Sequence, residues 1–103
     1  LLLRGAPQAV TGVPLRASRR ALIGIDKEHR TVIAVTDNLI GGLFWAELQE
    51  IFLAPQWQVQ TPDLLNLDGG GSAQLYIKAG KFDDFVAGTV EVPVAIGFFA
   101  KTQ

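Results

Sequence analysis

The apolar residues of this chain fall in short runs separated by polar turns, a pattern that predicts several short strands. Residues 20–26 and 31–36 are two such runs, rich in Ile, Val and Ala, and they flank the polar stretch 26–30. This arrangement predicts an antiparallel hairpin with a four- or five-residue loop. His29, the single histidine, and Asp26 are expected to serve this turn, which makes a Ser-His-Asp triad unlikely to form.

One segment follows a helical period instead. Between Leu43 and Leu53, apolar residues recur at i, i+4, i+7 and i+8, which places them on one face of a helix. These residues are Phe44, Leu48, Ile51 and Phe52. Pro55 is expected to end the helix, because proline disfavours helical geometry in the residue before it.

The remaining runs predict further strands. Leu64–Asp68 is expected to lead into a glycine loop, and Ala73–Lys78 to continue as a strand after it. Residues 81–87 are expected to be a turn or irregular. Residues 90–99 are apolar at many adjacent positions, which predicts a last strand that is buried on both faces.

The predicted elements add up to one domain. They favour the α+β class, with a mixed, largely antiparallel sheet and one main helix packed on it. A chain of 103 residues suits a single core. Residues 1–18 contain Pro and Gly and are expected to be an irregular segment or an edge strand, while 19–103 form the domain, interpreted as the carboxyl-terminal portion of a longer one.

Composition narrows the classes of function. The formal net charge of −1 argues against a nucleic-acid partner, which a basic excess usually accompanies. With no cysteine, the chain has neither disulfides nor thiolate metal sites. No apolar stretch is long enough to predict a membrane span. Six of the nine basic residues lie within residues 1–30, where Arg16, Arg19 and Arg20 form a small cluster.

Three consecutive glycines, Gly69–Gly71, lie between two predicted strands. Because a glycine run costs backbone entropy, it suggests a loop that must approach a ligand closely and present its N–H groups to an anion. The alternative is a flexible bulged hairpin. The loop matches neither a P-loop nor a dinucleotide fingerprint, and Ser72 lacks the closing glycine of a nucleophile elbow.

Two carboxylates are candidates for chemistry. Asp68 ends a predicted strand at the glycine loop, and Asp37 ends another before a glycine-containing loop. If both strands end at the same edge of the sheet, both carboxylates open onto it. Asp68 has the alternative role of capping its turn. The aspartates are too scattered to predict a metal site, and no cofactor is predicted, although a divalent cation held by loop carbonyls and a carboxylate stays open.

The segment Asn66–Ser72, Asn-Leu-Asp-Gly-Gly-Gly-Ser, resembles the motif of the phosphodiester glycosidase family. Three flanking segments resemble the family in order and spacing: Arg20–Gly24, the stretch from Asp37 through Gly42 to Leu48, and Val94–Phe98. Two positions depart from it. Ala73 stands where a second Ser or Thr is common, and Phe44 replaces the usual Ser or Thr near the start of the helix, which removes a cap.

The resemblance implies a hydrolase that cleaves a sugar, with N-acetylglucosamine as one candidate, from a sugar-1-phosphodiester. It implies that Arg20 and the Gly69–Gly71 amides hold the phosphate. Asp68 would act as nucleophile or base, with Asp37 as the second candidate, and Asn66 and Ser72 would position the sugar or the loop. It also favours a location outside the cytoplasm. The partner would be a carbohydrate phosphodiester.

Two other classes of function stay open. The chain could be a glycan- or phosphate-binding module without turnover. It could also be a structural fragment that associates with itself or with an upstream segment, because unpaired strand edges are sites of pairing.

Overall fold

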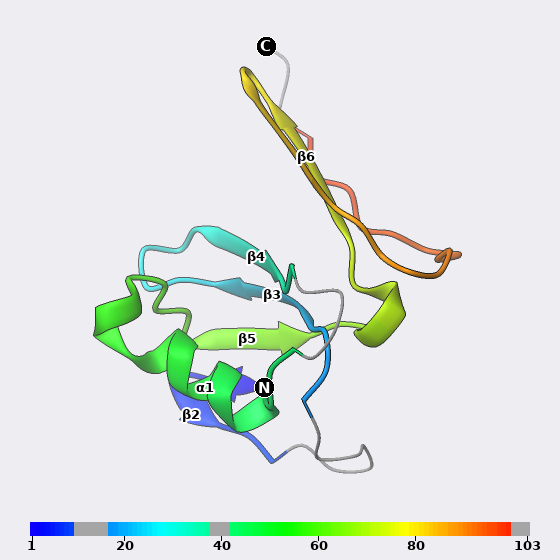
Figure 1. Cartoon of the computed structure of the whole chain (residues 1–103). Coiled ribbons are helices and arrows are strands. Elements are labelled where there is room, and N and C mark those ends of the chain that lie inside the picture. Colours follow the sequence, from blue (N-terminus) through cyan, green and yellow to red (C-terminus); the bar gives the residue numbers. More distant parts are fainter. Residues whose placement is uncertain (10–16, 38–41, 100–103) are drawn as a thin grey trace.

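The computed structural model describes residues 1–9, 17–37 and 42–99, which form two sheets and one α-helix (Figure 1). The larger sheet has the strand order β2-β1-β5-β3-β4. Its strands are β1 (Leu2–Leu3), β2 (Ala6–Pro7), β3 (Ala21–Ile25), β4 (Thr31–Val35) and β5 (Asp63–Asn66). All of its pairings are antiparallel. The predicted α+β class with an antiparallel sheet is confirmed.

The hairpin of β3 and β4 forms where the sequence predicts it, with Ala21 opposite Val35 and Ile25 opposite Thr31. Asp26 closes its turn by accepting hydrogen bonds from the backbone N–H groups of Glu28 and Arg30, at 2.9 and 2.8 Å. The Arg30 guanidinium adds a third bond at 2.8 Å. The bond from the Arg30 N–H is the main cause that lowers the pKa of Asp26.

The helix α1 spans Trp45–Leu53, two residues shorter at its start than predicted. Its buried stripe is Trp45, Leu48 and Phe52, whereas Phe44 is 47% exposed. Including Phe44 in the stripe was therefore wrong. Phe44 is the N-cap residue and has no side-chain acceptor, although its own N–H donates to the Glu47 carboxylate at 2.9 Å.

The core lies between this helix and one face of the larger sheet. Its members come from the helix and from three strands: Leu1, Leu2, Leu22, Trp45, Leu48, Phe52 and Leu64. After α1, a single 3₁₀ turn η1 (Pro55–Trp57) leads the chain back toward β5. Thr61 is fully buried on the way, and its hydroxyl donates to the Val59 carbonyl at 2.6 Å.

The smaller sheet is a hairpin of β6 (Leu75–Ala79) and β7 (Phe82–Val86) that extends away from the larger sheet (Figure 1). The turn or irregular segment predicted for residues 81–87 was wrong over β7. Ala79 pairs with Phe82, so Gly80 and Lys81 form the tight turn, and Gly80 has the positive φ of 59° that glycine permits. The segment lacks a two-residue alternation because Asp83 and Asp84 are adjacent, which hid the strand.

The strand predicted for residues 90–99 does not form, and burial on both faces is wrong. These residues have no assigned strand, and Val94 and Phe99 are 81% and 92% exposed. Apolar composition alone makes a strand only where a partner strand can satisfy its backbone N–H and C=O groups. Within the described residues, no strand pairs with this segment.

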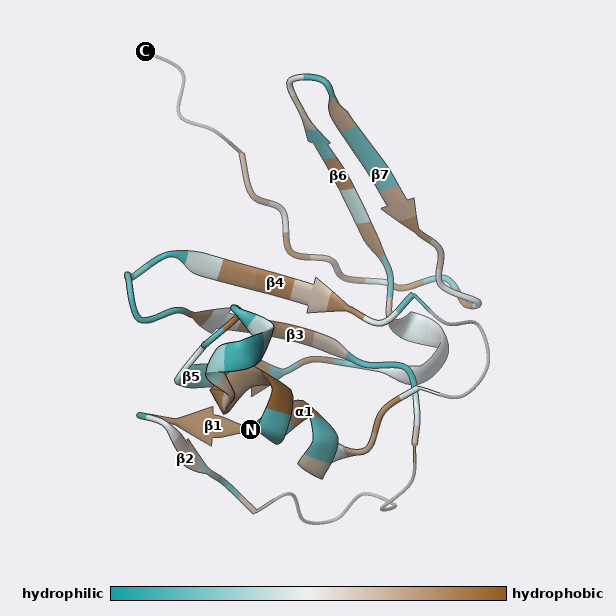
Figure 2. Cartoon of the chain, turned by 60° about the vertical axis from the view of Figure 1, so that its left-hand side comes forward, coloured by the Kyte–Doolittle hydropathy of each residue, from teal (hydrophilic) through white to brown (hydrophobic). Residues whose placement is uncertain are grey.

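The strands β3 and β4 are rich in apolar residues (brown in Figure 2), and several of these residues are exposed on the sheet face opposite α1. Because side chains alternate along a strand, the residues next to the core residues point to this second face. Four of them are at least 38% exposed: Leu3, Ile25, Ile33 and Leu65. The described part of the chain therefore buries one face of its main sheet and leaves the other uncovered.

The corrected helix stripe makes a direct prediction. Leu48→Ala should lower the free energy of unfolding by about 2–5 kcal/mol, because Leu48 is 2% exposed and a cavity would remain. Phe44→Ala is the matched control and should stay within about 0.5 kcal/mol, as is usual at exposed positions. Urea unfolding followed by circular dichroism measures both. Equal losses for the two variants would restore Phe44 to the core.

Candidate functional site at the glycine loop

The candidate residues gather at one end of the larger sheet. Since β3 is antiparallel to both β4 and β5, its first residue lies beside the last residues of its two neighbours. Arg20 immediately precedes β3, Asp37 follows β4 by two residues, and Asn66 ends β5. The glycine loop continues from β5 at the same end (Figure 1). The chain thus brings one arginine, two aspartates and the loop to a common edge.

The two candidate carboxylates are not adjacent, because β3 lies between their strands. Two strand spacings separate the backbones of β4 and β5 by about 9.5 Å. The ladder ends with Leu22 opposite Asn66 and Ala21 opposite Val35, and extending it by two residues puts Asp68 level with Arg20 and Asp37 level with Arg19. Both aspartates are exposed. Asp68 is therefore the carboxylate next to Arg20.

Arg20 is held on the helix side of the sheet. Only 7% of it is exposed, and its guanidinium carbon lies 3.7 Å from the centre of the Trp45 ring, a cation–π distance. Its Nε donates to the Leu43 carbonyl at 3.0 Å, and its backbone N–H donates to the Thr36 hydroxyl at 2.9 Å. These contacts orient the guanidinium before any ligand binds.

The glycine loop shifts the strand pairing by one residue. Leu67 donates to the Ala21 carbonyl at 2.8 Å, but the next bond to β3 comes from Gly70, which donates to the Arg19 carbonyl at 2.9 Å. Gly69 is passed over and lies so close to β3 that a β-carbon on it would lie 2.6 Å from the Arg19 carbonyl oxygen. Glycine is needed here for close approach and at Gly70 for a φ of 58°.

After this shift, the chain makes a single 3₁₀ turn, η2 (Gly70–Ser72). Ser72 and Ala73 donate within the turn, to the carbonyls of Gly69 and Gly70. Among the described residues, the N–H groups of Gly69 and Gly71 have no backbone acceptor. Of the three amides that the resemblance assigns to phosphate, that of Gly70 is used inside the fold, and those of Gly69 and Gly71 are not used by the described backbone.

The far side of the loop is fastened to residues 87–90. The Gly71 carbonyl accepts hydrogen bonds from Thr89 at 2.8 Å and from Val90 at 3.3 Å. Gly88 is also tightly placed, because a β-carbon on it would lie 2.8 Å from that carbonyl. The segment that follows the β6–β7 hairpin thus returns to the loop and contacts it.

Arg19 joins these parts and was not singled out from the sequence. It is 4% exposed, and its Nη2 donates to the Ala87 carbonyl at 2.7 Å. Its Nε and Nη1 are buried without a hydrogen-bond partner. Two successive arginines, Arg19 and Arg20, therefore lie beside the loop. The sequence does not show that Arg19 is buried, so it could not distinguish this residue from an arginine exposed to solvent.

The two remaining candidates, Asn66 and Ser72, belong to the same end of the sheet. Both are partly buried. Asn66 is opposite Leu22 on β3, and Ser72 ends η2. Neither side chain makes a hydrogen bond to the rest of the described chain, which leaves both polar groups available to a ligand.

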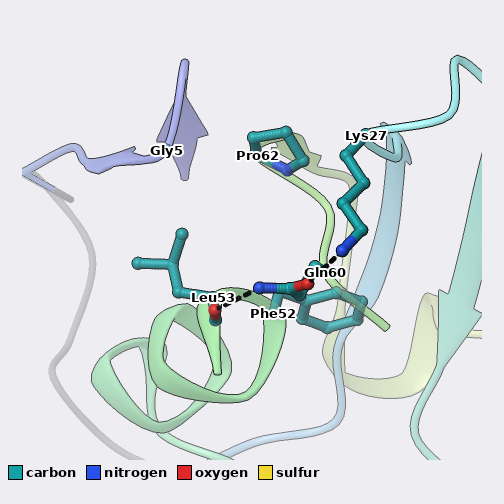
Figure 3. A pocket seen from close by; sticks show the side chains of 6 residues that line it. All are labelled: Gly5, Lys27, Phe52, Leu53, Gln60 and Pro62. Carbon is teal, nitrogen blue, oxygen red and sulfur yellow. Dashed lines mark hydrogen bonds between the residues drawn. The ribbon is translucent and has the colours of Figure 1, made fainter. Parts of the chain in front are cut away.

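A pocket of 240 Å³ lies at the other end of the sheet (Figure 3). Phe52, Leu53 and Pro62 give it apolar walls, and Lys27 points into it and donates to the Gln60 amide oxygen at 2.8 Å. Lys27 follows β3 and Pro62 precedes β5, so the pocket lies a full strand length away from the glycine loop. It contains none of the candidate residues.

Two searches of the described residues bear on other classes of site. None of the helices in these ranges is long and apolar enough to cross a membrane. Nowhere in the same ranges do three His, Asp or Glu residues gather as ligands for a metal ion.

Comparison with known families bears on the whole of this arrangement, because the matched range includes the glycine loop and both of its flanking strands. The family model described as phosphodiester glycosidase matches residues 3–99, almost the whole chain. The chain therefore belongs to the phosphodiester glycosidase family. Comparison with curated proteins and with solved structures gives no match.

Gly69 is crowded and Gly70 is not, and this difference can be measured. Gly69→Ala should lower the free energy of unfolding by about 2 kcal/mol or more, because its new β-carbon meets a backbone oxygen that cannot turn aside. Gly70→Ala should cost about 1 kcal/mol, since that site is open and only the positive φ opposes a side chain.

Chemical denaturation of both variants beside the wild type gives these values. Gly70→Asn is a useful third variant, because asparagine tolerates a positive φ better than alanine does. A Gly69→Ala protein as stable as Gly70→Ala would show that the loop does not press on the Arg19 carbonyl.

Proposed function

We propose that this chain carries the site of a hydrolase that releases a sugar from a sugar-1-phosphodiester. The observation that carries the proposal is the placement of a glycine loop, a preoriented arginine and a carboxylate at one end of one sheet, in a chain of the phosphodiester glycosidase family. N-acetylglucosamine is the sugar that the resemblance favours.

The phosphate half of the substrate would bind at the loop. The N–H groups of Gly69 and Gly71 are not used by the backbone of the described chain, and Arg20 lies across β3–β5 from Asp68. Amide and guanidinium donors stabilise the negative charge that grows on a departing phosphodiester. Because this leaving group is already a stable anion, the site has less need of a general acid than an ordinary glycosidase has.

The sugar half needs a carboxylate near its anomeric carbon. Asp68 is the leading candidate, because it is exposed and lies at the junction between β5 and the loop. It would act as the nucleophile or as the base that activates water. Asp37 is the second candidate for this role. Asn66 and Ser72 would hold the sugar or the loop.

The experiment is release of sugar from a panel of sugar-1-phosphodiesters that includes N-acetylglucosamine-1-phosphate diesters. Asp68→Asn should lower kcat/KM by about 10²–10⁴-fold, the range of acid–base contributions. Asp83→Asn is the matched control, since Asp83 is exposed on the β6–β7 hairpin and has no assigned role. Full activity of Asp68→Asn would overturn the assignment of Asp68.

Arg20 calls for a milder substitution, because it is buried against Trp45 and its removal would also weaken the fold. Arg20→Lys keeps the charge and loses the planar stacking. It should raise KM for the diester while the circular dichroism spectrum stays native. Binding of the diesters without any release of sugar would instead identify a binding module.

A second proposal concerns association. The apolar sheet face opposite α1 and the exposed Val94, Ile96 and Phe98 are more apolar surface than isolated small domains usually present. We propose that this surface is covered by pairing with another copy of the chain. Sedimentation at increasing protein concentration should show a rise from the 11.1 kDa monomer to a dimer. Ile33→Lys, on that face, should hold the chain monomeric, whereas a wild type that is monomeric throughout would overturn the proposal.

A further inference from the structure

Arg19 has a buried charge that the described chain does not neutralise. It is 4% exposed, and among the described residues one backbone carbonyl, that of Ala87, is the only hydrogen-bond acceptor of its guanidinium. Both its Nε and its Nη1 are buried and have no partner. Burial of a charged group without a compensating partner is costly, because the charge is removed from water.

No carboxylate among the described residues lies within ion-pair distance of Arg19. The ion pairs among the described residues join Arg30 to Asp26 and Glu28, in the turn at the opposite end of β3. The acidic residues nearest along the ladder and the return segment are Asp37, Asp68 and Glu91, and all three are exposed to solvent. Their charges are therefore screened more strongly than that of the buried arginine.

The buried charge of Arg19 lies beside the glycine loop. The Arg19 carbonyl accepts the Gly70 N–H, and Gly69 packs directly on the same carbonyl. Its guanidinium binds the residue before Gly88, and Gly88 packs on Gly71. Arg19 therefore touches the glycine loop through its backbone and the segment that fastens the loop through its side chain.

We propose that Arg19 is a positioning residue that makes the glycine loop selective for a phosphate oxyanion, through its uncompensated buried charge. The charge acts through the protein interior on the side of the loop away from Trp45, and the loop supplies the direct contacts. A charge in such surroundings is felt over several ångströms because little water intervenes. The inference rests on the proposed function only in taking the loop as the phosphate site.

The test uses the full chain, labelled with ¹⁵N, and inorganic phosphate as the probe. Phosphate is titrated at constant ionic strength while the amide resonances of Gly69–Ser72 are followed. In the wild type these resonances should shift and saturate. Arg19→Gln should weaken the phosphate affinity by about tenfold or more, the loss that one buried charge near the anion predicts.

Two further variants separate charge from structure. Arg19→Lys keeps the positive charge and should bind phosphate within about threefold of the wild type, a small fraction of the tenfold effect. Arg30→Gln removes the same charge from the exposed far turn and should bind like the wild type, because solvent and salt screen it. Circular dichroism reports whether each variant is folded.

The outcomes are distinct. A folded Arg19→Gln with wild-type affinity would overturn the inference, and so would an equal loss in Arg30→Gln. If Arg19→Gln does not fold, Arg19→Lys decides, because a folded lysine variant that has lost phosphate binding contradicts a role for charge. Phosphate binding that depends on Arg19, in a chain that releases no sugar, would support the inference and contradict the proposed hydrolase. Sugar release together with phosphate binding that does not depend on Arg19 would support the proposed hydrolase and overturn the inference about Arg19.

Discussion

The structure depends on the antiparallel pairing of β3 with a neighbour on each side. This strand fixes where β4 and β5 end, and so decides which loops meet. Its hydrogen bonds continue past the last residue of β5, where Gly70 still donates to the Arg19 carbonyl. Gly69 packs closely on that same carbonyl, so any movement of the loop away from the strand would break the contact between Gly69 and Arg19. The candidate site is therefore an extension of the sheet and not a free loop placed beside it.

The core elements could be predicted from the sequence because each has a strong local signal. The β3–β4 hairpin has two β-branched runs around a polar turn, and the aspartate that starts the turn closes it with hydrogen bonds. The helix was found by its period, and Leu48 and Phe52 were placed correctly on its buried face, but Trp45 belongs to that face in place of Phe44. Both Phe44 and Trp45 are large and aromatic, and the stacking of Arg20 on Trp45, a tertiary contact, decides which of them is buried.

The C-terminal part was predicted less well for a different reason. β7 carries two adjacent aspartates and lacks alternation, so its pairing with β6 depends on the tight turn at Gly80. Residues 90–99 have the composition of a buried strand and yet pair with no described strand. Composition measures what a segment prefers to bury. It does not show whether a neighbour is present to bury it.

For the candidate site too, the local sequence signal was predictive, whereas the features that depend on tertiary contacts could not be predicted. The motif Asn66–Ser72 identified the loop, since three glycines before a serine are a local signal, but the motif does not show that the Gly70 amide is used inside the fold. Arg19 and Arg20 are identical in sequence terms and differ only in the face of the sheet that each occupies. One stacks on Trp45, and the other binds the Ala87 carbonyl.

Leaving the Nε and Nη1 nitrogens of Arg19 buried without acceptors costs on the order of 1–3 kcal/mol for each nitrogen. An apolar residue of similar size would avoid this cost and could still pack between the same segments. Stability therefore favours an arginine only through the Nη2 bond to the Ala87 carbonyl, whereas the proposed role beside the glycine loop also accounts for the buried charge.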